Sequence, residues 1–454
     1  MSVLSIPYLI LSGASSIFLW LFSRKNRKYT TLLVNAVFLY LIAGTRMNVL
    51  YVLALTVWVY FFGKINAEKK NKGLFFLSLL VPVIGLGFFK YNGSIAMPLG
   101  ISFYTFKAIS YLSDCYMGKC TAQPIVNVID YICFFPVFMA GPINRPEGFF
   151  TELEQPLVFD YKDQKNGCIL AGLGLFEKLV IADELNRLVS LTLDNAEIGG
   201  WYTILGVILY SFRIYTDFDA YSNIAVGTAR MMGFHIERNF HAPYLSADIQ
   251  EFWRRWHISL STWLKDYIYI PLGGNRKGTF RKYLNILIVF LVSCIWHGNT
   301  KMFVIWGLGH GILSVLESLI LKPLKDKNWA KYLKPLGIII NFIFVTLLWI
   351  FFRASSGTQA MQILNNIYLA FQTPIAMSYE TLGITCNEYC WMFILIAVII
   401  VSDLFRYHID MLAWLENRNI VIRWIIYWLL MTASIIFGVY GPGYNPADFI
   451  YVTF

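Results

Sequence analysis

The chain has 454 residues, of which 57% are hydrophobic and only 14% charged, and its mean hydropathy is +0.57. A soluble domain carries roughly a quarter charged residues, so this composition indicates an integral membrane protein. The net charge of +10 comes largely from basic residues in short loops between apolar runs, which excludes nucleic-acid binding as its explanation.

Apolar runs follow one another along the whole chain. They lie near residues 3–22, 30–44, 48–63, 73–89, 98–113, 125–142, 167–182, 201–232, 283–297, 302–321, 335–352, 388–405 and 421–440. A helix needs about 20 apolar residues to cross a bilayer, and several runs are shorter. We therefore expect an all-α polytopic membrane protein with about 10–12 transmembrane helices plus re-entrant or interfacial helices.

No linker or break in composition divides the chain. This continuity predicts a single membrane-embedded domain over 1–454, with N-terminal spans at 1–95, a core at 96–320 that holds the candidate functional residues, and C-terminal spans at 321–454.

Basic residues alternate between the first loops. The first loop holds Arg24, Lys25, Arg27 and Lys28, and the third holds Lys64, Lys69, Lys70 and Lys72. The second loop, between them, holds only Arg46. Because short loops rich in Lys and Arg stay in the cytoplasm, this alternation predicts that the N-terminus lies outside.

The seven cysteines and six histidines show no metal-site spacing, and there is no CxxC pair. We therefore expect no bound metal. Glu177 and Glu317 fall within or near apolar runs, where pairing with a neighbouring helix is the favoured interpretation.

Between Arg213 and Asn223 the sequence turns polar among aromatic and small residues, and it contains two carboxylates. Asp217 and Asp219 match the DxD pair with which some glycosyltransferases hold a metal-bound sugar nucleotide, but so short a pattern recurs by chance. The same groups could instead hydrogen-bond neighbouring helices or pair with Arg213, as buried charges require. Both interpretations stay open, with Asp217 and Asn223 as candidates for lining a substrate site.

The segment 250–270 reads as one amphipathic helix that ends at a Pro/Gly turn. At 100° per residue, one face carries Trp253, Trp256, His257, Leu260, Leu264 and Tyr267, and the opposite face carries Arg254, Arg255, Thr262, Lys265 and Asp266. Such a helix suits a bilayer interface, with His257 pointing inward. His257 then either packs or caps, or belongs to a polar site.

The apolar run that starts at Tyr283 ends in Trp296-His297-Gly298. It is shorter than the roughly 20 residues of a full span, and Gly298 predicts a helix stop. The next run starts at Met302 and contains His310. An imidazole in such a run is costly unless water, a partner or a substrate reaches it. We expect His297 to lie in a cavity at membrane depth, with packing as the alternative.

Six segments together carry a resemblance to a known family. They are PLGISFYTFKAISYLSD (98–114), FFPVFMAGPINRPEGFF (134–150), IYTDFDAYSNIAVG (214–227), FHAPYLSADIQEFWRRWHISLSTWLKDYIYIPLGGNR (240–276), IWHGNTKMFVIWGLGHG (295–311) and FIYVTF (449–454). The chain resembles the membrane-bound O-acyltransferases (MBOAT), specifically the bacterial branch that acetylates alginate and related exopolysaccharides. The family more often reads DFSGYSD at 217–223, so Asp219 and Asn223 look like an exchanged acid–amide arrangement.

The resemblance implies helices around a central tunnel through the bilayer, in which an acyl group is transferred to a hydroxyl. His297 falls on the catalytic histidine of the WHG motif, and His257 on the second active-site histidine. The remaining substrate-site or tunnel-lining candidates are Trp296, Trp256, Trp253, Asp217, Asn223 and His310.

The implied reaction moves an acyl group, most simply acetyl, from a cytosolic thioester towards hydroxyls of a cell-surface or secreted polysaccharide, with His297 as general base. No cofactor is expected to stay bound, since the donor, acetyl-CoA or an acyl carrier protein, is a substrate. Expected partners are this donor on the cytoplasmic side, the polysaccharide or a secreted esterase-like acyltransferase outside, and membrane lipids. The expected location is the bacterial cytoplasmic (inner) membrane.

Two other functions stay open. One is D-alanyl transfer towards teichoic acid, with a carrier protein that docks on the cytoplasmic face. The other is a transporter or flippase in which the histidines relay protons, which inverted repeats would favour. The sequence shows no such self-similarity.

Overall fold

The computed structural model describes residues 4–23, 26–42, 46–92, 97–195, 198–320, 330–372, 378, 380–441 and 444. Within these ranges every regular element is a helix and none is a strand, which confirms the all-α prediction. Arg24, Lys25 and the terminal motif FIYVTF lie outside the described residues.

Two compact units share the chain. The first comprises Met1–Leu175, Ala220–Arg238 and Gly443–Phe454, and the second comprises Phe176–Asp219 and Asn239–Pro442. This division does not coincide with the predicted segments 1–95, 96–320 and 321–454. That the two units function as one domain over 1–454 stays a prediction.

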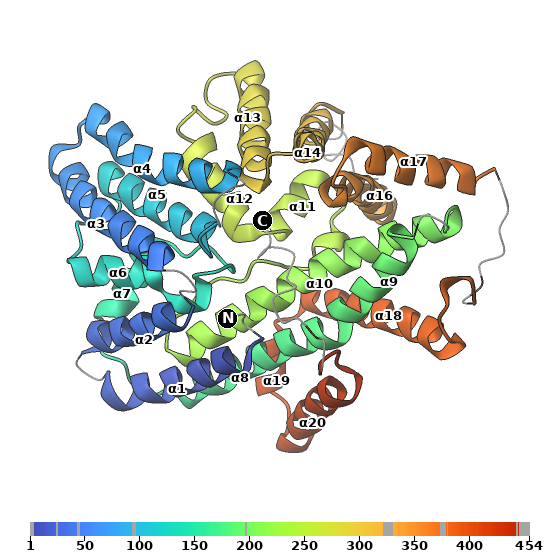
Figure 1. Cartoon of the computed structure of the whole chain (residues 1–454), viewed down its shortest axis with the longest axis horizontal. Helices are drawn as coiled ribbons and strands as arrows, with labels where there is room; N and C mark the ends of the chain where they lie inside the picture. Colours follow the sequence, from blue (N-terminus) through green and yellow to red (C-terminus); the bar gives the residue numbers. More distant parts are fainter. Residues whose placement is uncertain are drawn as a thin grey trace. The chain divides into compact units, whose positions relative to one another are not determined.

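The first unit contains most of the N-terminal helices (Figure 1). They are α1 (Ile6–Phe22), α2 (Arg27–Ile42), α3 (Arg46–Lys69), α4 (Lys72–Tyr91), α5 (Ile101–Met117), α6 (Ile125–Cys133), η1 (Phe135–Val137), α7 (Pro146–Glu154) and α8 (Tyr161–Phe176, of which Phe176 falls in the second unit). Helix α3 packs against α4 and α5, and α2 packs against α6.

The apolar run 125–142 is not one helix, because α6 ends at Cys133. Asn35 on α2 occupies this break: its amide nitrogen donates to Asp130 Oδ1 (3.0 Å), and its oxygen accepts the N–H of Phe135 (3.1 Å). The run is therefore split by a polar contact with another helix, and α6 alone is too short to cross a bilayer.

Two glycines bring α8 and the end of α10 (Trp201–Met231) into backbone contact. A Cβ built on Gly167 would lie 2.7 Å from the carbonyl oxygen of Gly227, and one built on Gly227 would lie 2.6 Å from that of Gly167. Small residues allow membrane helices to approach this closely.

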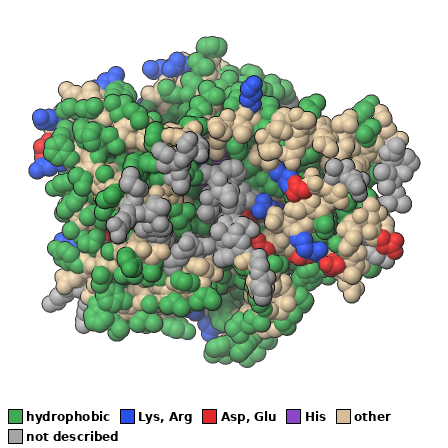
Figure 2. Space-filling model, in the orientation of Figure 1, with side chains coloured by type: hydrophobic (Ala, Val, Ile, Leu, Met, Phe, Trp, Pro, Cys, Tyr) green, Lys and Arg blue, Asp and Glu red, His purple; other side chains and the backbone are tan. Residues whose placement is uncertain are grey.

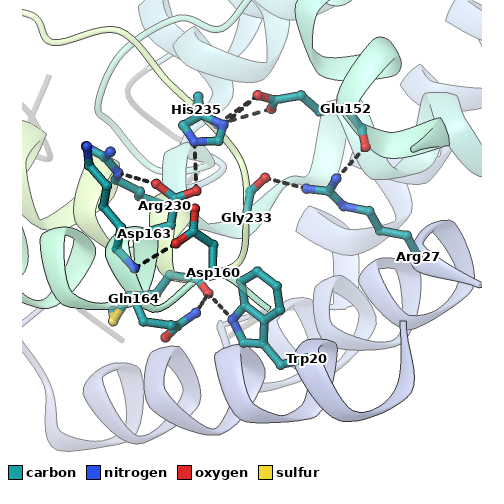
Figure 3. A network of polar contacts seen from close by, with 11 residues as sticks. Trp20, Arg27, Glu152, Asp160, Asp163, Gln164, Arg230, Gly233 and His235 are labelled. Carbon is teal, nitrogen blue, oxygen red and sulfur yellow. Dashed lines mark hydrogen bonds and ion pairs between the residues drawn. The ribbon is translucent and has the colours of Figure 1, made fainter. Parts of the chain in front are cut away.

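A polar cluster joins α7, α8 and the segment after α10 (Figure 3). His235 Nδ1 lies 2.9 Å from Glu152 Oε1, and His235 Nε2 lies 3.0 Å from Asp163 Oδ2. Asp163 also pairs with Arg230 (2.9 Å). Carboxylates only accept hydrogen bonds, so both contacts are satisfied together when the imidazole is protonated. The hydrogen bond to Glu152 is the largest of the effects that raise the pKa of His235.

The second unit contains the remaining helices. They are η2 (Glu177–Ala182), α9 (Asp183–Leu193), α10 up to Asp219, η3 (Pro243–Leu245), α11 (Ile249–Arg255), α12 (Ile258–Leu264), η4 (Lys265–Tyr269), α13 (Thr279–His297), α14 (Lys301–Ile320), η5 (Ala330–Leu333), α16 (Lys334–Arg353), α17 (Gly357–Ala370), η6 (Glu380–Leu382), α18 (Cys386–His408), α19 (Met411–Glu416) and α20 (Ile420–Phe437). Helix α14 packs between α13 and α16, and α11 also contacts α14.

Seven helices of the described chain are long and apolar enough to cross a membrane: Asn48–Lys69 of α3, α4, α13, α14, α16, α18 and α20. This number is below the expected 10–12 because several apolar runs fold into shorter helices, such as α1, α5 and α6. Hydrophobic side chains cover much of the face in Figure 2, and no residue of α20 is buried. Such surfaces suit contact with lipid.

Candidate functional site

Helix α13 places His297 at its C-terminal end. The helix starts at Thr279, four residues before the predicted apolar run, so its 19 residues come close to a full span. It stops at Gly298 as predicted, with extended backbone there. A Cβ on Gly298 would lie 2.4 Å from the ring of Phe303, so a larger residue would force that ring to move. His297 is 2% exposed.

Aromatic rings surround His297. The ring centroids of Trp296, Trp306 and Phe352 lie 4.4, 4.9 and 5.3 Å from that of the imidazole. Trp306 comes from α14 and Phe352 from α16, so three neighbouring helices form this environment.

His310 also contacts Trp306, with 5.3 Å between their ring centroids. The indole N–H of Trp253 donates to His310 Nδ1 at 3.4 Å. A neutral imidazole has one donor and one acceptor nitrogen, so this bond assigns the proton to Nε2. His310 is fully buried.

His257 lies at a break between two short helices, which makes the prediction of one continuous helix over 250–270 wrong. Helix α11 ends at Arg255, and His257 has left-handed backbone (φ 43°, ψ 54°) directly before α12. The predicted inward orientation is confirmed, because His257 is 1% exposed. His257 lies outside the seven candidate spans, and burial lowers its pKa to about 3, so the imidazole is neutral at physiological pH.

The three histidines alternate with two tryptophans. His257 lies 6.4 Å from Trp296 between ring centroids, Trp296 contacts His297, and Trp306 contacts both His297 and His310. Trp256 is also buried and packs on Trp349 (5.0 Å). Within the second unit, ring contacts thus connect six of the eight candidates from distant parts of the sequence: His257, His297, His310, Trp253, Trp256 and Trp296.

Asp217 and Asp219 of α10 are both held in ion pairs. Asp217 lies 2.7 Å from Lys178 of η2, and Asp219 lies 2.7 Å from Arg406 of α18. Arg406 also pairs with Glu177. These contacts match the helix-pairing interpretation, although the partners are Lys178 and Arg406 rather than Arg213.

The DxD interpretation meets a geometric obstacle. Residues two apart on a helix project about 200° from each other, so Asp217 and Asp219 cannot both ligate one ion. The part of the chain that the structure describes contains no group of three His, Cys, Asp or Glu arranged to hold a metal. Asn223, the remaining candidate, is buried and belongs to the first unit.

Several residues around the histidines were missed in the sequence. Trp306 lies four positions before His310 in one apolar run, so helical periodicity would have placed both on one face. Trp349 and Phe352 are three positions apart on α16, so helical periodicity likewise places them on one face of their helix. Phe218, whose ring centroid lies 4.7 Å from that of His257, carries no such local signal.

Comparison with known proteins identifies relatives of this chain. A sequence profile described as "MBOAT, membrane-bound O-acyltransferase family" matches residues 116–358, which include all three histidines. The probable alginate O-acetylase AlgI of Pseudomonas aeruginosa is 35% identical over 377 residues, covering 75% of this chain and 70% of that protein.

Two further relatives are named for other activities. The peptidoglycan O-acetyltransferase of Helicobacter pylori is 33% identical over 339 residues, which cover 64% of each protein. The teichoic acid D-alanyltransferase of Streptococcus thermophilus is 28% identical over 381 residues, covering 74% of this chain and 90% of that protein.

Proposed function

Because the chain belongs to the membrane-bound O-acyltransferase family, we propose that it transfers an acetyl group from a cytosolic thioester towards hydroxyls of a cell-surface or secreted polysaccharide. Relatives named as an alginate O-acetylase and a peptidoglycan O-acetyltransferase support acetyl as the group and a polysaccharide as the acceptor. The proposal places the enzyme in the bacterial cytoplasmic membrane with its N-terminus outside. A tunnel through the bilayer would let the cytosolic donor meet an acceptor that arrives from outside.

The single observation that carries this proposal is the position of His297. It is a buried histidine at the end of α13, held by aromatic rings from three helices and lying within the matched family range. Histidine has an ordinary pKa near 6.5, which suits it to accept a proton at physiological pH.

In the proposed step, His297 takes the proton of the acceptor hydroxyl while the hydroxyl oxygen attacks the thioester carbonyl. The new C–O bond forms, the C–S bond breaks, and the proton passes from His297 to the departing thiolate. No protein nucleophile is required. His257, or a donor near Trp256, would orient a reactant or stabilise the developing oxyanion. A secreted esterase-like partner would take over the acetyl group where the polymer does not reach the enzyme.

The test compares O-acetyl content of surface polysaccharide between wild type and His297→Ala at matched membrane abundance. We expect the variant to lose nearly all transfer. His408→Ala changes an exposed histidine at the end of α18 and serves as the matched control, with wild-type acetylation expected. Unchanged acetylation in His297→Ala contradicts the proposal.

A second candidate is D-alanyl transfer towards teichoic acid. The observation that favours it is the relative of that name, because the matched region covers 90% of it. Measuring esterified D-alanine beside acetate in the same cells separates the two activities. If D-alanine rather than acetate falls in His297→Ala, the acyl group in the first proposal is wrong. If the chain is instead a transporter that uses histidines as proton relays, the surface polymer of His297→Ala cells should keep its esters.

A further inference from the structure

The backbone of His257 is held in a conformation that it would rarely adopt alone. Its φ of 43° and ψ of 54° fall in the left-handed region, which a non-glycine residue enters only at a cost in free energy. The surrounding structure must therefore hold His257 in place. The side chain of His257 does not cap α12, although the residue occupies the N-cap position.

Asn239 supplies this cap from the segment that precedes α11. Its backbone carbonyl accepts the N–H of Ile258 (2.9 Å), and its side-chain oxygen accepts the N–H of Ser259 (3.2 Å). Both donors belong to the first turn of α12, where helix N–H groups have no partner within the helix. Asn239 is completely buried. The cap thus comes from a residue distant in sequence, and the imidazole of His257 is not used for it.

The next residue, Phe240, completes the support. Its ring lies 5.0 Å from Trp256 and 5.0 Å from Phe218 between centroids. Phe218 in turn meets the imidazole of His257 at 4.7 Å, with the two planes perpendicular. Asn239 and Phe240 therefore fix the backbone of His257 on one side and the ring that packs against its imidazole on the other.

We propose that Asn239 is a positioning residue: by capping α12 across the break, it sets the orientation of the His257 imidazole without touching a reactant. The inference rests on the proposed function, in which His257 orients a reactant or stabilises charge. It predicts that transfer depends on the acceptor atom at the end of the Asn239 side chain and on where that atom lies.

The test uses three variants of the full chain. Asn239→Ala removes the side-chain acceptor, Asn239→Gln keeps the amide but moves it by one methylene, and Asn239→Asp keeps the acceptor in place. The matched control is Asn341→Ala, which removes another buried asparagine in the same unit, one that donates to the carbonyl of Ser246 at 3.0 Å.

Two quantities are measured at matched membrane abundance: polysaccharide O-acetyl content, and the rate at which diethyl pyrocarbonate modifies His257, followed by peptide mass spectrometry. We expect Asn239→Ala and Asn239→Gln to lower transfer about tenfold or more, since small displacements at a reacting centre have effects of this size. They should also raise the rate of modification several-fold. Asn239→Asp should lose less transfer than Asn239→Ala, because Asp is a good N-cap residue although its charge is costly to bury. Asn341→Ala should leave both quantities unchanged.

The inference is overturned if Asn239→Ala and Asn239→Gln accumulate normally and leave the modification rate of His257 at its wild-type value. It is also overturned if Asn239→Asp loses as much transfer as Asn239→Ala. A different pattern isolates the proposed function: if modification rises as expected but His257→Ala retains full transfer, the positioning contact stands and the role proposed for His257 fails. The Gln variant keeps the test valid should the Ala variant not accumulate.

Discussion

The indole of Trp306 stands almost perpendicular to the imidazole of His297, with ring centroids 4.9 Å apart and 84° between the planes. Edge-to-face contacts of this kind fix the orientation of both rings. Trp306 is fully buried, so it holds His297 by packing rather than through solvent.

The first prediction concerns this contact. Trp306→Ala should lower the free energy of unfolding by about 3–5 kcal/mol, as expected for a buried tryptophan, and should lower transfer as well. Trp306→Phe keeps an aromatic face and should retain more of both. Thermal unfolding in detergent and O-acetyl content measure the two effects. Equal transfer in Trp306→Ala and wild type would show that the contact does not matter for His297.

Gly298 gives the second prediction. In Gly298→Ala the new methyl group would lie 2.4 Å from the Phe303 ring, which itself lies 6.1 Å from His297 between centroids. The ring must move, so we expect transfer to fall more than protein abundance does. Gly357→Ala is the control, because its methyl group would meet only Met302 at an ordinary 3.6 Å. A similar loss in both variants would contradict the explanation.

The buried ion pairs of η2 give the third prediction. Lys178 Nζ lies 2.7 Å from both Asp183 and Asp217. Lys178→Met should destabilise the protein by about 3–5 kcal/mol, because it leaves buried carboxylates without their counter-ion. Adding Asp217→Asn should restore part of the loss. A double-mutant cycle on unfolding in detergent measures the coupling, and purely additive losses would show that the pair contributes nothing.

The fourth prediction is a pH dependence of stability at His235. Its pKa is raised in the folded protein, so its stabilising contribution is fully present below the ordinary value near 6.5 and is lost as the pH rises through the raised value. Wild type should therefore exceed His235→Gln in Tm by more at pH 5.5 than at pH 9. Glu152→Gln removes the main hydrogen-bond partner and should reduce this pH dependence. A difference in Tm between wild type and His235→Gln that stays constant from pH 5.5 to pH 9 would contradict this prediction.

The sequence predicted the helical class, the stop after His297 and the burial of His257, since each depends on local pattern: hydropathy, a glycine and helical periodicity. The break at His257 was not predictable, because left-handed backbone at a histidine has no local signature and depends on Asn239. The partners of Asp217 and Asp219 were missed for a related reason. Lys178 and Arg406 lie far away in sequence, and only the fold brings them to α10.

The aromatic surroundings of the histidines have a practical consequence. Tryptophan is the strongest natural fluorophore in proteins, and its emission depends on the groups that its indole contacts. Four of the 14 tryptophans touch one of these imidazoles: Trp253, Trp296, Trp306 and Trp349. The emission of these tryptophans should therefore respond to changes in packing around the histidines, without any attached label.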